Sequence, residues 1–344
     1  MKVKLIYTIY ALLIVLLAFS LLWACKKQDS DPDTSNSKVE QHDKQNLQAI
    51  SFRPKWHPQA QFAGIYMAQK MGFYNDYGLD IDFQPALSDS EAVREMQAGN
   101  TDILSLDLLT ALSLNNRKNT VVNIGQTTQK ASLMLVGRKS RGIRSIKDFS
   151  GKKLGLWRSG PNIIPMAYLK DHDIDMDVVY IDWSINLFTQ GVLDVVNVMR
   201  YNEYHQILQS GIPEDDLFIL AFDETEYNIP DEGFYTSEAF YRAHPKACRA
   251  FVEATMDGWT YAFTHPEETI EEVLRIMKEA QIRANVTHQS WMLQNIKDVV
   301  MEKPDNLGVL TEMDFNNAQD VLHKMGILDR NIGYQEFYPS APRQ

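Results

Sequence analysis

A short segment near residue 60 combines aromatic and amide side chains where a strand is predicted to end and a helix to begin. It spans 56–66 and carries Trp56, Gln59, Gln61 and Phe62. The N–H groups of a first helical turn have no partner within the helix and suit a hydrogen-bond acceptor, while an indole ring offers a flat face for stacking. The segment therefore predicts one wall of a small-molecule site. Packing in the core is the alternative role for Trp56 and Phe62.

A second segment places a carboxylate at an equivalent junction. Tyr201, Asn202 and Glu203 follow a predicted strand at 194–199 and open a predicted helix at 203–209. Local N–H groups can hold such a carboxylate, which can then accept a hydrogen bond from an amine or a ring N–H of a ligand. These residues predict the opposite wall, with Tyr201 and Asn202 beside a flat ring. A solvent-facing charge is the alternative for Glu203, and a turn is the alternative for its two neighbours.

Three more strand ends carry side chains that we expect to face the same cleft, because open α/β folds bind ligands at the carboxyl ends of their strands. The largest group follows one predicted strand and consists of Arg158, Ser159, Gly160 and Asn162. Asp107 ends another strand, where capping a helix is the alternative role. Trp183 ends a third, where packing is the alternative.

The elements behind these junctions alternate between short apolar runs and helical patterns, which is typical of α/β folds with parallel-rich sheets. The strands predicted for a first lobe cover 49–53, 79–83, 102–106, 121–124 and 133–136. Those predicted for a smaller second lobe cover 153–157, 178–181, 194–199 and 217–221. Beyond Phe234 the pattern becomes mainly helical, and we expect this tail to pack on the first lobe.

We therefore predict an α/β fold of two lobes with mixed sheets, a hinge between them and a helical C-terminal tail. The first lobe comprises 49–137 and 234–344, and the second comprises 138–233. Hinges are expected near Gly137 and near 232–234. Two lobes also suit the length, because 344 residues exceed one ordinary domain.

The first 25 residues predict export across a membrane. A positively charged start is followed by an almost unbroken apolar run at 5–24, which is the pattern of a secretory signal. The sequence LWAC at 22–25 resembles the bacterial lipobox, so Cys25 is predicted to be acylated and to anchor the chain at the cell envelope. An uncleaved membrane helix is the alternative, and it places the rest of the chain on the same side. Residues 26–48 are polar and predict a flexible tether.

Composition and motifs argue against several other functions. The formal net charge of −11 and the lack of a basic stripe argue against a nucleic-acid partner. The 8 histidines lie on separate segments without metal-ligand spacing, and the sequence has no Gly-x-Ser-x-Gly elbow, P-loop or dinucleotide fingerprint. We therefore expect no metal, no cofactor and no enzymatic activity. Cys248 lies in an amphipathic helical pattern, so we expect it to be buried rather than paired.

Three motifs in order along the chain resemble those of the nitrate/sulfonate/taurine-type binding proteins of ABC importers. The opening motif reads WHPQAQFAG at 56–64, followed by GFY at 72–74 and GLDI at 78–81. The later motifs read GKKLGLW at 151–157 and VMRYNEY at 198–204. Together they cover nearly all of the chain after the tether. Within that superfamily the chain is most similar to the branch that binds pyrimidine precursors of thiamine.

The resemblance implies a type II periplasmic-binding-protein fold, a ligand held between the opening motif and the turn from Tyr201 to Glu203, and a membrane permease as partner of a monomeric chain. The ligand it favours is a thiamine pyrimidine precursor, and a sulfonate, nitrate or other small metabolite is the alternative. The family often has consecutive glycines followed by Asn-Glu near 159–163. This chain reads SGPNI there, which lacks the acidic residue and allows a different ligand.

A related eukaryotic group with the same lobes makes the thiamine pyrimidine. It uses a lysine that holds pyridoxal phosphate, a sacrificial histidine and a cysteine-rich iron site. The region where the lysine and histidine would lie reads DILSLDLLT at 102–110, and the chain has 2 cysteines in all. A synthase is therefore the less favoured alternative, and a binding protein is predicted.

Overall fold

The computed structural model describes residues 47–116, 121–158 and 160–340. The predicted signal peptide, the lipidation site at Cys25 and most of the predicted tether lie outside the described residues. The tether was predicted to extend to Gln48, but this residue already belongs to the first strand. Within the described part, no helix has both the length and the apolar composition that a membrane span requires.

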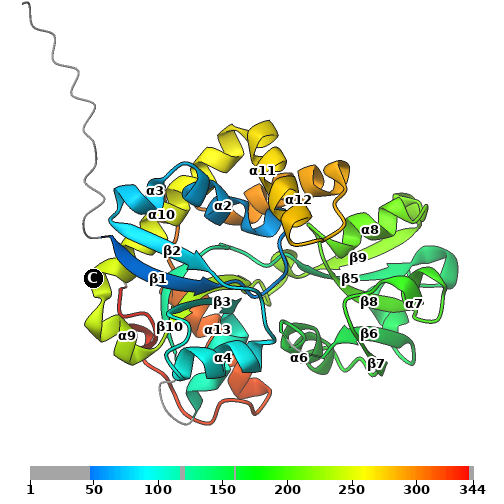
Figure 1. Cartoon of the computed structure of the whole chain (residues 1–344). Helices are drawn as coiled ribbons and strands as arrows, with labels where there is room; N and C mark the ends of the chain where they lie inside the picture. Colours follow the sequence, from blue (N-terminus) through cyan, green and yellow to red (C-terminus); the bar gives the residue numbers. More distant parts are fainter. Residues whose placement is uncertain (1–46, 117–120, 159, 341–344) are drawn as a thin grey trace, which may run out of the picture. The chain divides into compact units, whose positions relative to one another are not determined.

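A five-stranded mixed sheet forms the centre of the first lobe, with strand order β2-β1-β3-β10-β4 (Figure 1). Its strands are β1 (Gln48–Arg53), β2 (Leu79–Phe83), β3 (Ile103–Asp107), β4 (Val122–Gln126) and β10 (Glu232–Thr236). β2 and β3 flank β1 in parallel, and β10 runs antiparallel to both β3 and β4. Every residue of β3 is buried, as expected for a central strand that is covered on both faces.

A second five-stranded mixed sheet forms the second lobe, with strand order β7-β6-β8-β5-β9. Its strands are β5 (Leu133–Arg138), β6 (Lys153–Trp157), β7 (Asp177–Ile181), β8 (Val195–Met199) and β9 (Leu217–Ala221). β6 lies parallel to β7 and β8, whereas β5 pairs antiparallel with β8 and β9. The helices of this lobe are α6 (Ile163–Asp171), α7 (Asn186–Thr189) and α8 (Glu203–Gln209).

The other α-helices pack with the first sheet and with one another. They are α2 (Ala63–Lys70), α3 (Phe73–Asp76), α4 (Asp89–Gln97), α5 (Leu108–Ser113), α9 (Glu238–Ala243), α10 (Pro245–Thr264), α11 (Pro266–Glu279), α12 (Val286–Val300), α13 (Glu312–Lys324) and α14 (Tyr334–Phe337). Short 3-10 helices are η1 (Ala60–Phe62), η2 (Leu114–Asn116), η3 (Lys139–Arg141), η4 (Ile146–Phe149), η5 (Glu214–Asp216), η6 (Phe222–Glu224) and η7 (Pro304–Asn306). The helical tail returns to the first lobe, where α10 packs on α2, α3 and β4. Cys248, in α10, is buried.

The predicted α/β fold of two mixed sheets with a helical tail is confirmed, but the sheets divide the chain differently from the predicted lobe boundaries. β5 lies in the second sheet, although 133–137 was predicted for the first lobe. β10 begins at Glu232 in the first sheet, although 232–233 was predicted for the second lobe. The chain thus crosses between the sheets at 127–132 and 222–231. An apolar run predicts a strand but not its sheet, because partners distant in the sequence decide the pairing.

Helices α10 and α2 pack closely where they cross. A Cβ atom added to Gly258 would lie 2.1 Å from the carbonyl oxygen of Gly64 and 2.7 Å from the Cβ of Ala68, so only glycine fits. The same crossing seats the indole of Trp259 against Gly64. Trp259 is thereby held in the wall of a cavity between the lobes.

Replacing Gly258 by alanine should destabilise the protein by about 1 to 3 kcal/mol. The added methyl group overpacks the helix crossing, and this cost exceeds the gain of about 1 kcal/mol in helix propensity. Urea unfolding followed by circular dichroism measures the change. Glu253→Ala, on the exposed face of the same helix, is the matched control and should stay within about 0.5 kcal/mol of the parent protein. An unchanged urea midpoint for Gly258→Ala would show that α2 and α10 can move apart without a loss of stability.

Candidate functional site

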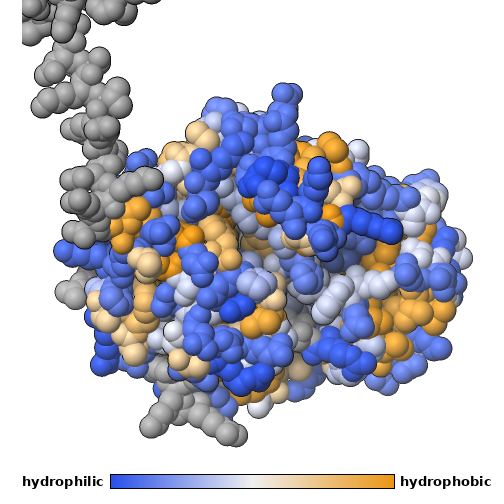
Figure 2. Space-filling view, in the orientation of Figure 1, coloured by the Kyte–Doolittle hydropathy of each residue, from blue (hydrophilic) through white to orange (hydrophobic). Residues whose placement is uncertain are grey.

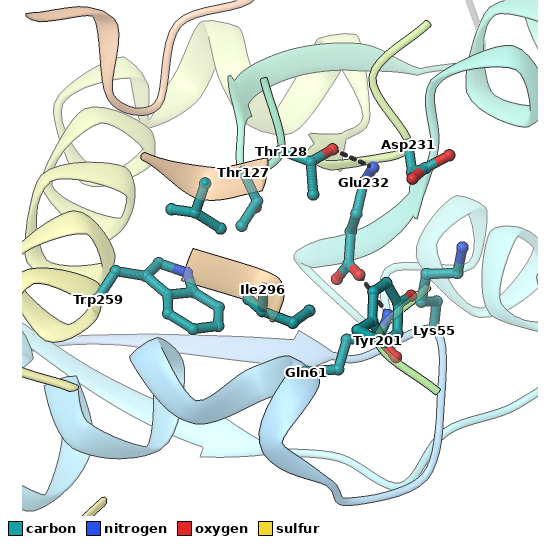
Figure 3. Close-up of a pocket in the computed structure, with 10 residues that line it drawn as sticks. Lys55, Gln61, Thr127, Thr128, Tyr201, Asp231, Glu232, Trp259 and Ile296 are labelled. Atoms are coloured by element: carbon teal, nitrogen blue, oxygen red, sulfur yellow. Dashed lines mark hydrogen bonds between the residues drawn. The ribbon is translucent and has the colours of Figure 1, made fainter. Parts of the chain in front are cut away.

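A small cavity lies between the two lobes, beside the segments where the chain crosses from one sheet to the other (Figure 3). Its wall consists of Lys55, Gln61, Thr127, Thr128, Tyr201, Asp231, Glu232, Trp259, Ile296 and Val300. Tyr201 comes from the second lobe, and the other residues come from the first lobe or from the crossing segments. The volume of this inner cavity is about 10 Å³, which is room for about one water molecule.

A chain of amide and carboxyl groups forms the first-lobe side of the inner cavity. The side-chain amide of Gln59 donates to Oε1 of Gln61 at 2.7 Å, and that of Gln61 donates to Oε2 of Glu232 at 2.6 Å. The backbone N–H of Glu232 donates to Oγ1 of Thr128 at 2.9 Å (Figure 3). The two glutamines predicted as ligand residues are therefore buried beside the cavity and held in place by Glu232.

A partly buried ion pair lies at the edge of the inner cavity, where the second lobe approaches. The ammonium group of Lys55 binds Oδ1 of Asp107, and Gly160 approaches so closely that a Cβ there would lie 3.1 Å from Oδ2 of Asp107. The alternative role of Asp107 is not realised, because its side chain makes no capping hydrogen bond to α5. Burial by itself lowers the pKa of Lys55, but nearby carboxylates, Asp107 foremost, outweigh burial and raise it.

Two further carboxyl groups in the wall lack an ionic partner. In the described ranges, no basic side chain lies within ion-pair distance of Asp231 or Glu232. Burial raises the pKa of Glu232 to about 7, against the opposing charge of Lys55. Burial and the charge of Asp107 also raise the pKa of Asp231 to about 7. Near neutral pH both side chains therefore exchange between the acid and the carboxylate.

Three buried polar groups in the wall have no hydrogen-bond partner. They are Oγ1 of Thr127, Oδ1 of Asp231 and Nε1 of Trp259, on side chains that are at most 5% exposed. An unsatisfied buried donor or acceptor costs about 1 to 3 kcal/mol. Because these donors and acceptors line one cavity, they indicate a ligand that would supply the missing partners.

A second, more open cavity of about 360 Å³ also lies where the lobes meet. Its wall consists of Ser88, Asp89, Ser90, Val93, Thr110, Ser113, Leu114, Gly160, Asn162 and Ile163. Gly160 and Asn162, both predicted ligand residues, belong to the second-lobe side, and Asn162 is oriented by donating to the backbone carbonyl of Trp157 at 3.0 Å. The close approach of Gly160 to Asp107 brings this outer cavity next to the ion pair of Lys55 and Asp107. Its volume is typical of small-molecule pockets.

The turn from Tyr201 to Glu203 lies at the inner cavity, but its side chains point in different directions. Tyr201 forms part of the cavity wall. Glu203 does not, because its Oε2 accepts from the backbone N–H of Met199 at 3.0 Å and its Oε1 accepts from the amide of Asn202 at 2.7 Å. Burial raises the pKa of Glu203 to about 7. The carboxyl group thus stabilises the turn itself, and ligand contact through Glu203 stays a prediction.

Asn202 connects this turn to α12 through two stacked histidines. The side-chain carbonyl of Asn202 accepts from Nε2 of His288 at 3.0 Å, and Nδ1 of His288 lies 2.8 Å from Nδ1 of His205. Since neutral His288 donates through Nε2, its Nδ1 accepts and His205 is the donor. The two ring planes are 4° apart, and His205 also stacks on Trp291. Burial lowers the pKa of His288 to about 4, which keeps the ring neutral.

Two tryptophans predicted as ligand residues meet each other between the lobes. Trp56 is half-buried, Trp183 is 54% exposed, and their rings pack edge to face with centroids 4.5 Å apart. Phe62 is 1% exposed and packs against Tyr66, which agrees with its alternative role in the core. These side chains lie outside both cavity walls.

The remaining predicted residues lie on the second lobe. Arg158 is exposed, with its guanidinium carbon 5.8 Å from the ring centroid of Tyr180, and Ser159 lies outside the described residues. The same lobe carries apolar surface over β6, β7 and α7 (Figure 2). Its exposed large apolar side chains include Leu187 and Val192.

Sequence reasoning missed most of the inner cavity wall. Lys55 directly precedes the opening motif, but nothing in the sequence distinguishes it from a surface lysine. Asp231 and Glu232 are consecutive acids before a glycine, and this acidic pair at a strand start was a signal that could have been used. Thr127 and Trp259 enter the cavity from segments that are distant in the sequence, so no local pattern marks them.

Known proteins show a consistent likeness to this chain. A family model described as NMT1/THI5 like matches residues 59–269, more than half of the chain. The YtlA protein of Bacillus subtilis is 22% identical over 294 residues, which cover 80% of this chain and 83% of that protein. A 4-amino-5-hydroxymethyl-2-methylpyrimidine phosphate synthase of Aspergillus parasiticus is 21% identical over 65% of this chain and 69% of its own length. The periplasmic aliphatic sulphonate binding protein SsuA from Escherichia coli matches with a TM-score of 0.64 and 12% identity, covering 85% of this chain and 97% of that chain.

Two mixed sheets, two crossing segments and a cavity between the lobes define a protein of the periplasmic-binding-protein fold. At 12% identity the likeness to the solved structure establishes the fold alone. The family match goes further, and the chain belongs to the NMT1/THI5 like family. The fold and the superfamily implied by the sequence motifs are thereby confirmed.

Replacing His288 by glutamine should change how the stability of the protein depends on pH. The pKa of His288 in the folded protein, about 4, lies below its ordinary value of 6.5, so between these pH values the unfolded chain binds more protons. The contribution of this histidine is therefore present at pH 7 and is lost as the pH falls toward 4. We expect the parent protein to exceed the variant in unfolding free energy by about 1 kcal/mol at pH 7, and this difference to shrink at pH 5.

Urea unfolding at pH 7 and pH 5 measures this difference directly. His172→Gln, at the exposed end of α6, is the matched control for the loss of a histidine. A difference that stays constant for His288→Gln would contradict the neutral histidine pair.

Proposed function

We propose that this chain is the extracytoplasmic solute-binding component of an ABC importer and that it binds a thiamine pyrimidine precursor between its lobes. The observation that carries the proposal is the inner cavity. Both lobes contribute residues to its wall, and three buried polar groups of the wall have no hydrogen-bond partner. Each of these groups costs free energy in the empty protein until a partner arrives. A polar ligand whose donors and acceptors match these groups therefore binds favourably for two reasons. It makes new hydrogen bonds, and it removes the free-energy cost of the unpartnered groups.

An aminopyrimidine supplies hydrogen-bond partners of both kinds. Its exocyclic amine can donate to Asp231 or Glu232, and its ring nitrogens can accept from the indole N–H of Trp259 or the hydroxyl of Thr127. The ring of Tyr201 offers a flat surface against which a heterocycle can pack. The relative from Aspergillus parasiticus is named for such a pyrimidine, which supports this class of ligand.

Closure of the lobes is the mechanism that fits this geometry. The inner cavity holds about one water molecule, so a ring can enter only when Tyr201 and the rest of the second lobe move away. A ligand that contacts both lobes binds the closed form more tightly than the open form and so shifts the population toward closure. The edge-to-face contact of Trp56 with Trp183 adds about 0.5 to 1.5 kcal/mol to the closed form.

Binding without chemical conversion is the activity that we propose. An amine that forms a Schiff base must first lose its proton. Surrounding carboxylates outweigh the effect of burial and raise the pKa of Lys55, so the one lysine in the described wall of the inner cavity stays a cation. A synthase activity like that named for the relative from Aspergillus parasiticus is therefore the less favoured alternative.

A sulfonate or nitrate is the second candidate ligand, and the likeness to the sulphonate binding protein of Escherichia coli is the observation in its favour. An anion needs basic groups or free N–H donors in the wall. Lys55 is the basic side chain of the described inner wall, and it is already paired with Asp107. The charge of the cavity therefore favours the pyrimidine.

The remaining parts of the proposal concern the cell envelope. We infer that Cys25 is acylated, that the protein is a monomer tethered outside the membrane, and that its closed form docks on a membrane permease. The exposed apolar surface that includes Leu187 and Val192 supports docking on another protein, because such patches commonly mark interaction surfaces.

Isothermal titration calorimetry with thiamine pyrimidines and with alkanesulfonates tests the proposed function. Gln61→Ala and Tyr201→Ala should each weaken pyrimidine binding at least tenfold, because each removes contacts from one of the two lobes, worth about 1.4 kcal/mol or more. Tyr77→Ala, on the outer surface of the first lobe, is the matched control and should leave the affinity unchanged. Tighter binding of an alkanesulfonate than of any pyrimidine would favour the second candidate, and turnover of a bound pyrimidine would favour the synthase.

A further inference from the structure

The inner cavity contains more acidic than basic groups. Its charged wall residues are Asp231, Glu232 and Lys55, and Lys55 is already paired with Asp107. The titratable side chains that face the two wall acids are Lys55, Asp107, Tyr66, Tyr201 and Tyr235. Lys55 is the one cation in that set. When Asp231 and Glu232 are ionised, the cavity region therefore has three carboxylates, including that of Asp107, and one ammonium group.

The two wall acids face the inner cavity, and Asp231 has a carboxyl oxygen without a hydrogen-bond partner. Oδ2 of Asp231 accepts from the backbone N–H of Ser132 at 2.8 Å, but its Oδ1 has no partner. The carboxyl group of Glu232 points into the cavity and is held there by Gln61 (Figure 3). Each acid is 5% exposed, so bulk water does little to solvate either charge. A buried carboxylate in such a setting is strongly stabilised by a cation that can reach it.

We propose that Asp231 and Glu232 select a positively charged ligand, so that protonated 4-amino-5-aminomethyl-2-methylpyrimidine binds more tightly than its neutral 5-hydroxymethyl counterpart. This inference rests on the proposed function, since it concerns which precursor the same site takes. An ammonium group carries three donors and a hydroxyl carries one, and charge-assisted hydrogen bonds are about twice as strong as neutral ones. An anion instead adds negative charge beside two carboxylates, so the same two residues reject sulfonates.

Binding of the charged pyrimidine is also coupled to the release of protons. Burial raises the pKa of Asp231 and of Glu232 to about 7, so at pH 7 both are partly protonated in the empty protein. A bound cation favours the carboxylate form, and the displaced protons pass to the buffer. The neutral hydroxymethyl pyrimidine has no charge that would favour the carboxylate form, so its binding should release no protons.

Titration calorimetry of the parent protein at pH 7 with each of the two pyrimidines tests this selection. We expect the aminomethyl compound to bind at least tenfold more tightly. Its binding heat should differ between phosphate and Tris buffers, which have different ionisation enthalpies, whereas the heat of the hydroxymethyl compound should not. The double variant Asp231→Asn, Glu232→Gln keeps the side-chain shapes and should reduce the preference to less than about threefold. Asp298→Asn, an exposed acid of α12, is the matched control and should keep the full preference.

The outcomes separate this inference from the function on which it rests. Equal affinity for the two pyrimidines in the parent protein, or tighter binding of the hydroxymethyl compound, overturns selection by charge and leaves the proposed function standing. Binding of neither pyrimidine overturns the proposed function as well. If the double variant does not fold, the affinity ratio of the two pyrimidines and the buffer dependence of the binding heat, both measured on the parent protein, still test selection by charge.

Discussion

The partly buried ion pair of Lys55 and Asp107 is the interaction on which the arrangement of the site depends. Lys55 follows β1 and Asp107 ends the neighbouring parallel strand β3, so the sheet itself brings the two side chains together. Taking two charges out of water costs several kcal/mol for each, and only close pairing offsets that cost. Gly160 of the second lobe lies against the same carboxylate, at a position where a side chain would crowd it. The ion pair thus lies where the first sheet, the inner cavity and the second lobe meet.

Around this pair the protein leaves several polar groups incomplete. Thr127, Asp231 and Trp259 each present a buried polar atom without a partner to the same small cavity. A protein that only had to be stable would satisfy these groups or replace them by apolar ones, because either change lowers the free energy of the folded state. These groups lie on both crossing segments and on α10, so a movement of the lobes as we propose would change their surroundings. In the proposed mechanism, ligand binding and lobe closure are therefore coupled in one equilibrium.

The proteins similar to this chain include some whose names describe binding and some whose names describe synthesis, so the fold does not decide the activity. The residues around Lys55 favour binding in this chain. Its amine is surrounded by carboxylates that keep it protonated, whereas a reactive amine needs a neighbourhood that removes its proton. In the function that we propose, the same excess of acid that keeps Lys55 a cation also favours positively charged ligands. One electrostatic feature therefore bears on both the activity and the specificity.

The sequence by itself determined the elements and the family. The strand pattern at 79–83, 153–157 and 217–221 agrees with β2, β6 and β9 residue for residue, because the period of apolar side chains and the glycine and proline stops are local properties. Local motifs also placed Gln61 and Tyr201, which the structure brings to one cavity. Only the tertiary structure decided that β5 joins the second sheet and that β10 enters the first. It alone assembled Lys55, Asp231, Glu232 and Trp259, because burial and pairing between residues far apart in the sequence are set by the packing of whole lobes and leave no local pattern.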